Sequence, residues 1–149
     1  MRNFIRKILP LAFVFTVIFT MTAFASDFTA TTAEITSQSR TVDEGTLSDV
    51  STFSPAAPVT DVFATDLYIQ NGRVFLEIAI IGYGDRRVTL DGRAVTATRI
   101  RTVGNPVYAF IETYDLGPAT AGTRTLNFRT TSFNSPWNTI TETFTVTVY

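Results

Sequence analysis

The chain has 149 residues with 12 basic and 13 acidic side chains, no cysteine and no histidine, and its one lysine and both methionines lie within the first 25 residues. From Ser26 onward it therefore lacks side chains for Ser-His-Asp, Cys-His and Ser-Lys catalysis, for disulfides and for structural zinc sites, and we expect a non-enzymatic protein with no cofactor and no metal. That part carries nine arginines against thirteen Asp and Glu, a balance that argues against nucleic acid as a partner.

Residues 1–25 have the features of a secretory signal peptide. A basic start precedes an apolar stretch over 8–23, and Ala23-Phe24-Ala25 supplies the small residues of a cleavage site. The alternative is an uncleaved membrane anchor, but the apolar stretch is shorter than the roughly 20 residues that span a bilayer. We expect cleavage before Ser26, export to the extracellular space or periplasm, and no membrane attachment afterwards.

Residues 26–60 are rich in Thr, Ser and Ala and hold five acidic residues against Arg40. The region ends in a Pro-containing run over 54–58. Such a composition offers little apolar surface to bury, so it predicts a flexible or loosely attached segment, in which 28–35 could add an edge strand. Patterned hydrophobicity begins at Asp61, and a single folded domain is predicted over 61–149.

The strongest local signal is Asn71-Gly72, which separates two apolar-rich runs over 65–81. Asn-Gly favours a tight type I′ hairpin, which would pair Gln70 with Arg73. One face of that hairpin then consists of aliphatic side chains only, so the register is strongly set. These are Leu67, Ile69, Val74, Leu76, Ile78 and Ile80.

Further strands are expected along the rest of the domain. They are a second hairpin over 88–95 turning at Asp91-Gly92, and single strands over 108–114, 123–131 and 140–149. In the last of these, Phe144, Val146 and Val148 alternate with threonines, the pattern of a half-buried antiparallel strand. Six to eight short strands without a helical crossover predict an all-β fold, a single antiparallel β-sandwich.

Two resemblances accompany this pattern. The Gly-containing turn and alternating strand over 114–128, with the final F-x-V-x-V strand, resemble the late strands of bacterial Ig-like and fibronectin-like modules. The strings at 81–84, 114–115 and 130–139 resemble a family of small secreted bacterial proteins, the Bacillus YolA-like proteins. That family has no established biochemical role, so the resemblance implies secretion and a compact β domain, with no catalytic residue to carry over.

Trp137, the only tryptophan, lies between two predicted strands and is followed by Asn138. A loop tryptophan beside hydrogen-bonding side chains could stack on a sugar ring or anchor a protein partner, or it could fold back and cap the core. Tyr83, between two glycines, offers the same alternatives. Arg86 and Arg87 begin a group of five arginines within 16 residues that could bind a carboxylate or phosphate, or simply face solvent.

Three functional hypotheses follow. The preferred one is a secreted binding protein that recognises a surface glycan or protein through its loops. The expected ligand-binding residues are Trp137, Asn138, Tyr83, Arg86 and Arg87. The second is a structural or assembly subunit whose N-terminal segment adds as a strand to a neighbour's sheet edge. The third is a small hydrolase that uses two carboxylates about 5–10 Å apart. Its candidates are Asp85, Asp91, Glu112 and Asp115.

Overall fold

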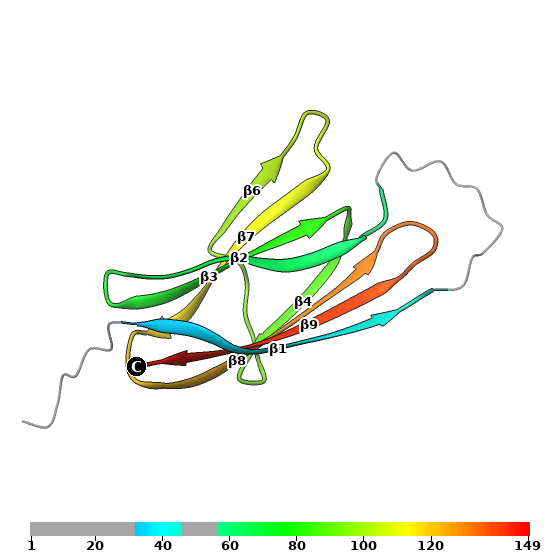
Figure 1. Cartoon of the computed structure of the whole chain (residues 1–149). Helices are drawn as coiled ribbons and strands as arrows, with labels where there is room; N and C mark the ends of the chain where they lie inside the picture. The colour runs from blue at the N-terminus through cyan, green and yellow to red at the C-terminus, as the bar shows by residue number, and fades with distance from the viewer. Residues whose placement is uncertain (1–31, 46–56) are drawn as a thin grey trace, which may run out of the picture.

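The computed structural model describes residues 32–45 and 57–149, which form two antiparallel β-sheets packed face to face (Figure 1). One sheet has the strand order β1-β9-β8-β4-β5, and the other has the order β2-β3-β7-β6. The strands are β1 (Ala33–Asp43), β2 (Asp61–Gln70), β3 (Arg73–Ile81), β4 (Gly84–Leu90), β5 (Arg93–Ala94), β6 (Arg99–Val103), β7 (Ala109–Pro118), β8 (Gly122–Ser132) and β9 (Thr139–Val148). The predicted all-β sandwich is confirmed.

The predicted signal peptide and its cleavage site lie outside the described residues. Within the described ranges, no helix is long and apolar enough to cross a membrane.

The first hairpin forms as its turn chemistry predicts. Gln70 pairs with Arg73, and Asn71 and Gly72 have φ values of 51° and 70°, the left-handed values of a type I′ turn. All six predicted aliphatic side chains belong to the core, with the four on β3 fully buried and the two on β2 partly buried. The second hairpin turns at Asp91-Gly92, also as predicted.

The other half of the core comes from β8 and β9. Phe128 on β8 and Phe144 on β9 are the largest fully buried side chains, and Val146 and Val148 extend the same buried row. Burying a side chain of this size contributes roughly 1.5–3 kcal/mol. The threonines that alternate with this row lie on the outer face, as the period-two pattern predicts.

Glycines at the end of β3 allow the chain to pass from one sheet to the other. Gly82 has a φ of 98°, and a Cβ there would overlap the backbone of Pro58. A Cβ at Gly84 would lie 2.5 Å from the carbonyl oxygen of Thr131. The Gly-Tyr-Gly sequence therefore makes the tight corner between the sheets, and Tyr83 occupies the middle of that corner.

The assignment of 26–60 to a loosely attached segment needs correction at residues 33–43. These residues form β1, an edge strand that pairs with β9 from Ala33 to Asp43 with one bulge. Only Ala33 and Ile35 of this strand pack against the core, so the sequence indicated a possible edge strand over 28–35 but not the strand that continues to Asp43. Backbone pairing with β9 holds the strand instead. Residues 26–31 and 46–56 lie outside the described residues.

Candidate functional site

An open cavity of about 330 Å³ lies where the outer face of β4 and β8 meets the loop between β8 and β9. Its lining combines two aromatic rings, two arginines, one carboxylate and two hydroxyls. The lining residues are Asp85, Arg87, Arg129, Thr131, Ser132, Phe133 and Trp137.

Trp137 and Phe133 form the aromatic part of this lining, and both are exposed, at 44% and 55%. Trp137 has a left-handed backbone with a φ of 60°, and its N–H donates to the carbonyl of Asn134 at 2.9 Å. The N–H of Ser132 donates across the loop to the carbonyl of Asn138 at 2.9 Å. Of the two alternatives for Trp137, the structure thus has the indole at the surface rather than folded under the sandwich.

Arg87 on β4 and Arg129 on β8 lie directly opposite each other in the strand register. Both side chains are exposed on the outer face of the sheet. Arg87 has only a distant ionic contact, 3.9 Å from Nε to Asp85, and both groups of this pair are largely solvated. Arg129 forms no ion pair or side-chain hydrogen bond with the described residues. The cavity therefore carries two positive charges and one negative charge.

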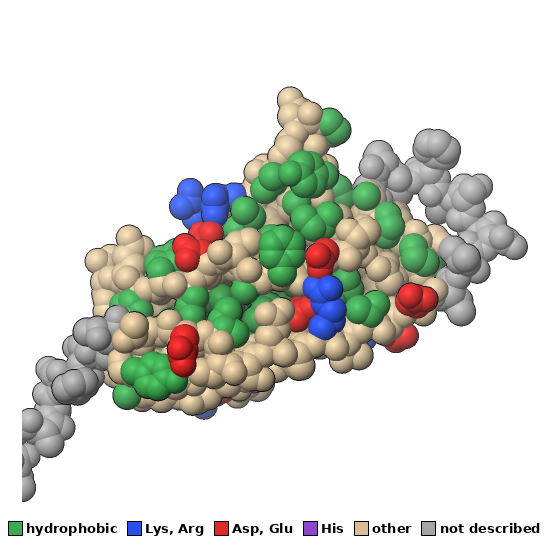
Figure 2. All heavy atoms as spheres, in the orientation of Figure 1, with side chains coloured by type: hydrophobic (Ala, Val, Ile, Leu, Met, Phe, Trp, Pro, Cys, Tyr) green, Lys and Arg blue, Asp and Glu red, His purple; other side chains and the backbone are tan. Residues whose placement is uncertain are grey.

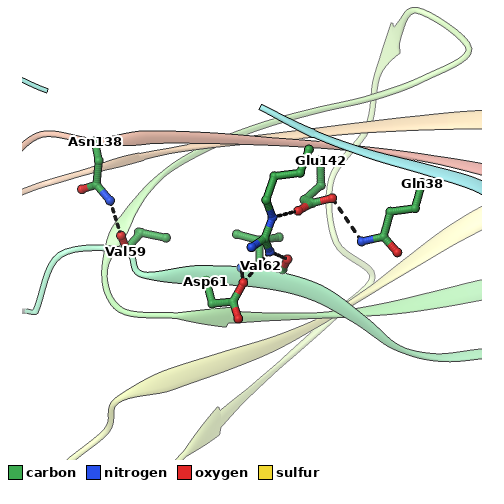
Figure 3. Close-up of polar contacts among 7 residues, drawn as sticks. Gln38, Val59, Asp61, Val62, Asn138 and Glu142 are labelled. Carbon is green, nitrogen blue, oxygen red and sulfur yellow. Dashed lines mark hydrogen bonds and ion pairs between the residues drawn. The ribbon is translucent and has the colours of Figure 1, made fainter. Parts of the chain in front are cut away.

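Two other predicted ligand-binding residues have scaffold contacts instead. The Tyr83 hydroxyl donates to the carbonyl of Val107 at 2.8 Å, and its ring packs edge-to-face on Phe110 at 5.2 Å. The Asn138 amide donates to the carbonyl of Val59, and Figure 3 shows Asn138 directed at Val59. Asn138 also accepts a hydrogen bond from the Ser132 hydroxyl. Asn138 thus fixes the segment that leads into β2.

Arg86, the neighbour of Arg87, points between the sheets rather than toward the cavity. Its Nε lies 2.6 Å from Oε1 of the buried Glu112 on β7, and its guanidinium carbon lies 4.8 Å from the ring centre of Phe110. The Tyr114 hydroxyl donates to the same carboxylate. Burial, reinforced by this hydrogen bond, raises the pKa of Tyr114. These residues join the two sheets and are not part of the outer face.

A second charged contact between the sheets lies where β1 and β2 form neighbouring edges. Arg40 donates to the fully buried Glu142 and to Asp61, and Gln38 donates to Glu142 at 3.1 Å. Figure 3 shows Glu142 facing Gln38, and Figure 2 shows a basic group between acidic groups on this side of the molecule, surrounded by apolar side chains. The hydrogen bonds to Glu142 and Asp61 raise the pKa of Arg40.

A larger cavity of about 540 Å³ adjoins this contact. It is lined by Arg40, Val42, Glu44, Thr60, Pro136, Asn138 and Ile140. Arg40 is already paired there and Asn138 is held by Val59, and the lining contains no aromatic ring. The cavity at Trp137 is therefore the stronger candidate site.

The four carboxylates proposed for hydrolysis occupy four separate places. Asp85 lines the cavity, and Glu112 lies between the sheets. Asp91 lies in the β4–β5 turn, where its carboxylate accepts from the N–H of Thr125 at 2.8 Å. Asp115 belongs to β7 in the other sheet. The part of the chain that the structure describes holds no cluster of three or more acidic side chains that could bind a metal ion.

Asp115 has a structural role of its own. Its carboxylate accepts from Arg73 at 2.7 Å and from the N–H of Gly117 at 2.8 Å. Partial burial raises the pKa of Asp115, but these hydrogen bonds outweigh that effect, and the pKa lies below its usual value. The carboxylate is therefore a fixed, ionised partner for β3.

A protein family described as a domain of unknown function, DUF4879, matches residues 54–146. The chain belongs to this family. The matched range begins before β2, ends within β9 and contains every residue of the Trp137 cavity, whereas β1 lies outside it. No curated protein and no solved structure matches the chain.

The structure thus brings together Trp137 and Arg87 from the predicted set and adds residues that the sequence reasoning did not select. Arg129 and Phe133 are the main additions. Phe133 lies in the same loop sequence as Trp137, and this second aromatic residue near the tryptophan could have been selected from the sequence as a binding residue. Arg129 is 42 positions from Arg87, and only the pairing of β8 with β4 brings the two together.

Proposed function

We propose that this chain is a secreted, non-enzymatic protein that binds an extracellular glycan in the Trp137 cavity. The observation that carries the proposal is the exposed indole of Trp137 beside a polar cavity on a rigid sheet. Secretion rests on the leader sequence over 1–25.

The lining suits a sugar because it offers two kinds of contact at once. An aromatic ring provides an apolar surface for the C–H face of a pyranose, while the arginine and carboxylate groups can hydrogen-bond its hydroxyls. The volume of about 330 Å³ lies at the lower end of the range for small-ligand sites. One or two sugar rings of a longer chain are the expected occupants, since the cavity is open.

The surroundings of the cavity favour a glycan over a protein. The outer face of β8 and β9 next to it carries mainly hydroxyl side chains, some of them paired across strands, such as Thr131 with Thr139 at 3.0 Å. A protein interface needs about 800 Å² per partner around a central apolar anchor. This face offers Trp137 and Phe133 but no apolar surround of that size.

One tryptophan makes the test specific to the site, because all indole fluorescence comes from Trp137. The purified protein is titrated with a panel of neutral and acidic oligosaccharides, and emission is recorded. A saturable change is expected with at least one glycan, and Phe133→Ala should weaken that binding by about tenfold, or roughly 1.4 kcal/mol. Tyr108→Ala, at an exposed aromatic residue outside the cavity lining, is the matched control and should leave binding unchanged.

The proposal fails if no glycan changes the emission or binds by calorimetry. Capture of a protein through the same residues, abolished by Trp137→Ala, would replace the glycan with a protein ligand.

A second candidate is assembly through β1. This strand has eleven residues, lies at the sheet edge and is exposed from Thr36 to Asp43, so its outer side presents backbone groups that pair with no other described strand. A second sheet edge could pair with it. Light scattering over a range of protein concentrations tests this, and a monomer at all of them would exclude it.

A further inference from the structure

Resting on the proposed function, we propose that the sugar bound in the Trp137 cavity is acidic and that its carboxylate lies between Arg87 and Arg129. The occupant would be a uronic-acid unit of an extracellular polysaccharide, with its ring on Trp137. The charge of the ligand is thereby specified, which the aromatic ring alone leaves open.

The two arginines are placed so that an anion could lie between them. Residues directly opposite on antiparallel strands have Cβ atoms about 4.5–5.5 Å apart, and like charges at such positions are unfavourable. Arg87 and Arg129 occupy such a pair of positions and point to the same face. An anion between them would turn this repulsion into two charge-assisted contacts.

The two cations also have free hydrogen-bonding capacity. The contact between Arg87 and Asp85 spans 3.9 Å, with the two side chains 80% and 64% exposed, so it contributes little. Arg129 has no ionic partner among the described residues. Among the other seven described arginines, Arg40, Arg73, Arg86 and Arg101 lie in close contact with carboxylates, whereas Arg93, Arg99 and Arg124 do not.

The chemistry of the guanidinium selects a planar anion. Its N–H groups form a fork that matches both oxygens of a carboxylate, and the resulting bonds are stronger than those between neutral groups. With a neutral sugar, both guanidinium groups would remain hydrogen-bonded to water. With an acidic sugar, Asp85 could accept a hydrogen bond from a hydroxyl of the same ring. The two arginines and Asp85 together give the site a net charge of +1, which favours an anion.

The test compares two ligands that differ in charge but hardly in shape, an oligogalacturonate and its methyl ester. Affinities are measured by calorimetry with the purified protein at low ionic strength. The acid should bind about tenfold more tightly than the ester, and added salt should reduce that advantage. Arg129→Gln should abolish the difference by weakening only the acid.

Two variants make the result specific. Arg93→Gln changes an exposed arginine of β5 outside the cavity and should leave both affinities unchanged. Arg129→Lys keeps the charge but removes the fork, and should recover only part of the preference for the acid. Circular dichroism confirms that each variant is folded.

The outcomes separate this inference from the proposed function. Equal binding of acid and ester would overturn the inference and leave glycan binding intact. Binding of neutral sugars alone would do the same. Failure of all glycans to bind would overturn the proposed function and the inference with it.

Discussion

Replacing Arg86 with methionine should destabilise the fold far more than the same replacement of a surface arginine. Glu112 is 1% exposed, and Arg86 is its only cationic partner among the described residues, at 2.6 Å. Removing one member of a buried pair leaves an uncompensated charge and costs about 3–5 kcal/mol. A small domain is stable by about 5–15 kcal/mol, so Arg86→Met should remove a large share of that stability.

The double variant Arg86→Met/Glu112→Leu should recover about half of the loss. Nε and Nη2 of Arg86 and Oε1 of Glu112 form no aligned hydrogen bond with the described residues, so an apolar pair forfeits little directional bonding. The remaining cost is the lost acceptor of the Tyr114 hydroxyl, about 1–3 kcal/mol. We expect a coupling free energy above about 2 kcal/mol between the two positions.

Urea denaturation followed by far-ultraviolet circular dichroism measures all four proteins of this cycle. Arg87→Met is the matched control, because that side chain is exposed and its ionic contact is long. Its loss should stay below about 1 kcal/mol. Additive effects of the two single changes, or a cost of Arg86→Met as small as that of the control, would refute the buried pair as a link between the sheets.

Three further predictions concern pH and backbone geometry. Stability should fall above about pH 10 by about 1.4 kcal/mol per pH unit, because Tyr114 ionises there in the unfolded chain while its raised pKa keeps the folded phenol neutral. Urea titrations at alkaline pH should show a smaller slope for Tyr114→Phe. Thermal unfolding should show that Gly84→Ala, with its Cβ against the backbone of β8, costs about 3 kcal/mol, whereas Gly72→Ala, strained but in open space, costs about 1 kcal/mol. Arg73→Gln should cost less than about 1 kcal/mol of stability at neutral pH. Because the folded pKa of Asp115 is lowered, the Arg73–Asp115 ion pair stabilises the fold above about pH 4, and this stabilisation should vanish as acid protonates the folded carboxylate.

The features that the sequence predicted are local ones. The hairpin at Asn71-Gly72 needs a turn with left-handed backbone and an alternating pattern on both sides, and both can be seen within 17 residues. The same holds for the turn at Asp91-Gly92 and for the alternating row of β9. The period-two alternation of apolar residues and the residue types of the turns are sufficient to predict such elements.

The features that the sequence did not predict depend on pairing between distant strands. β1 packs only two partly buried side chains against the core, and its partner β9 lies at the other end of the chain. β6 has exposed side chains along four of its five residues, so it has no apolar pattern to detect. Backbone pairing is independent of side-chain identity, which is why the sequence indicated only the start of β1, as a possible edge strand over 28–35, and missed β6.

The candidate site shows the same division. The loop of Trp137 could be selected from its residues, although its exposure could not. Arg86 and Arg87 are neighbours in sequence, but successive residues of a strand point to opposite faces, so one joins the sheets and the other lines the cavity. Arg129 enters the site only through the register of β8 against β4.

The most direct test of glycan binding at Trp137 is a nuclear magnetic resonance titration. A chain with one tryptophan gives one indole N–H resonance, and an oligogalacturonate should shift it together with the Nε–H resonances of Arg87 and Arg129. The Nε–H of the internal Arg86 should stay in place. An indole resonance that does not move, under conditions where calorimetry detects binding, would place the glycan elsewhere and contradict the account.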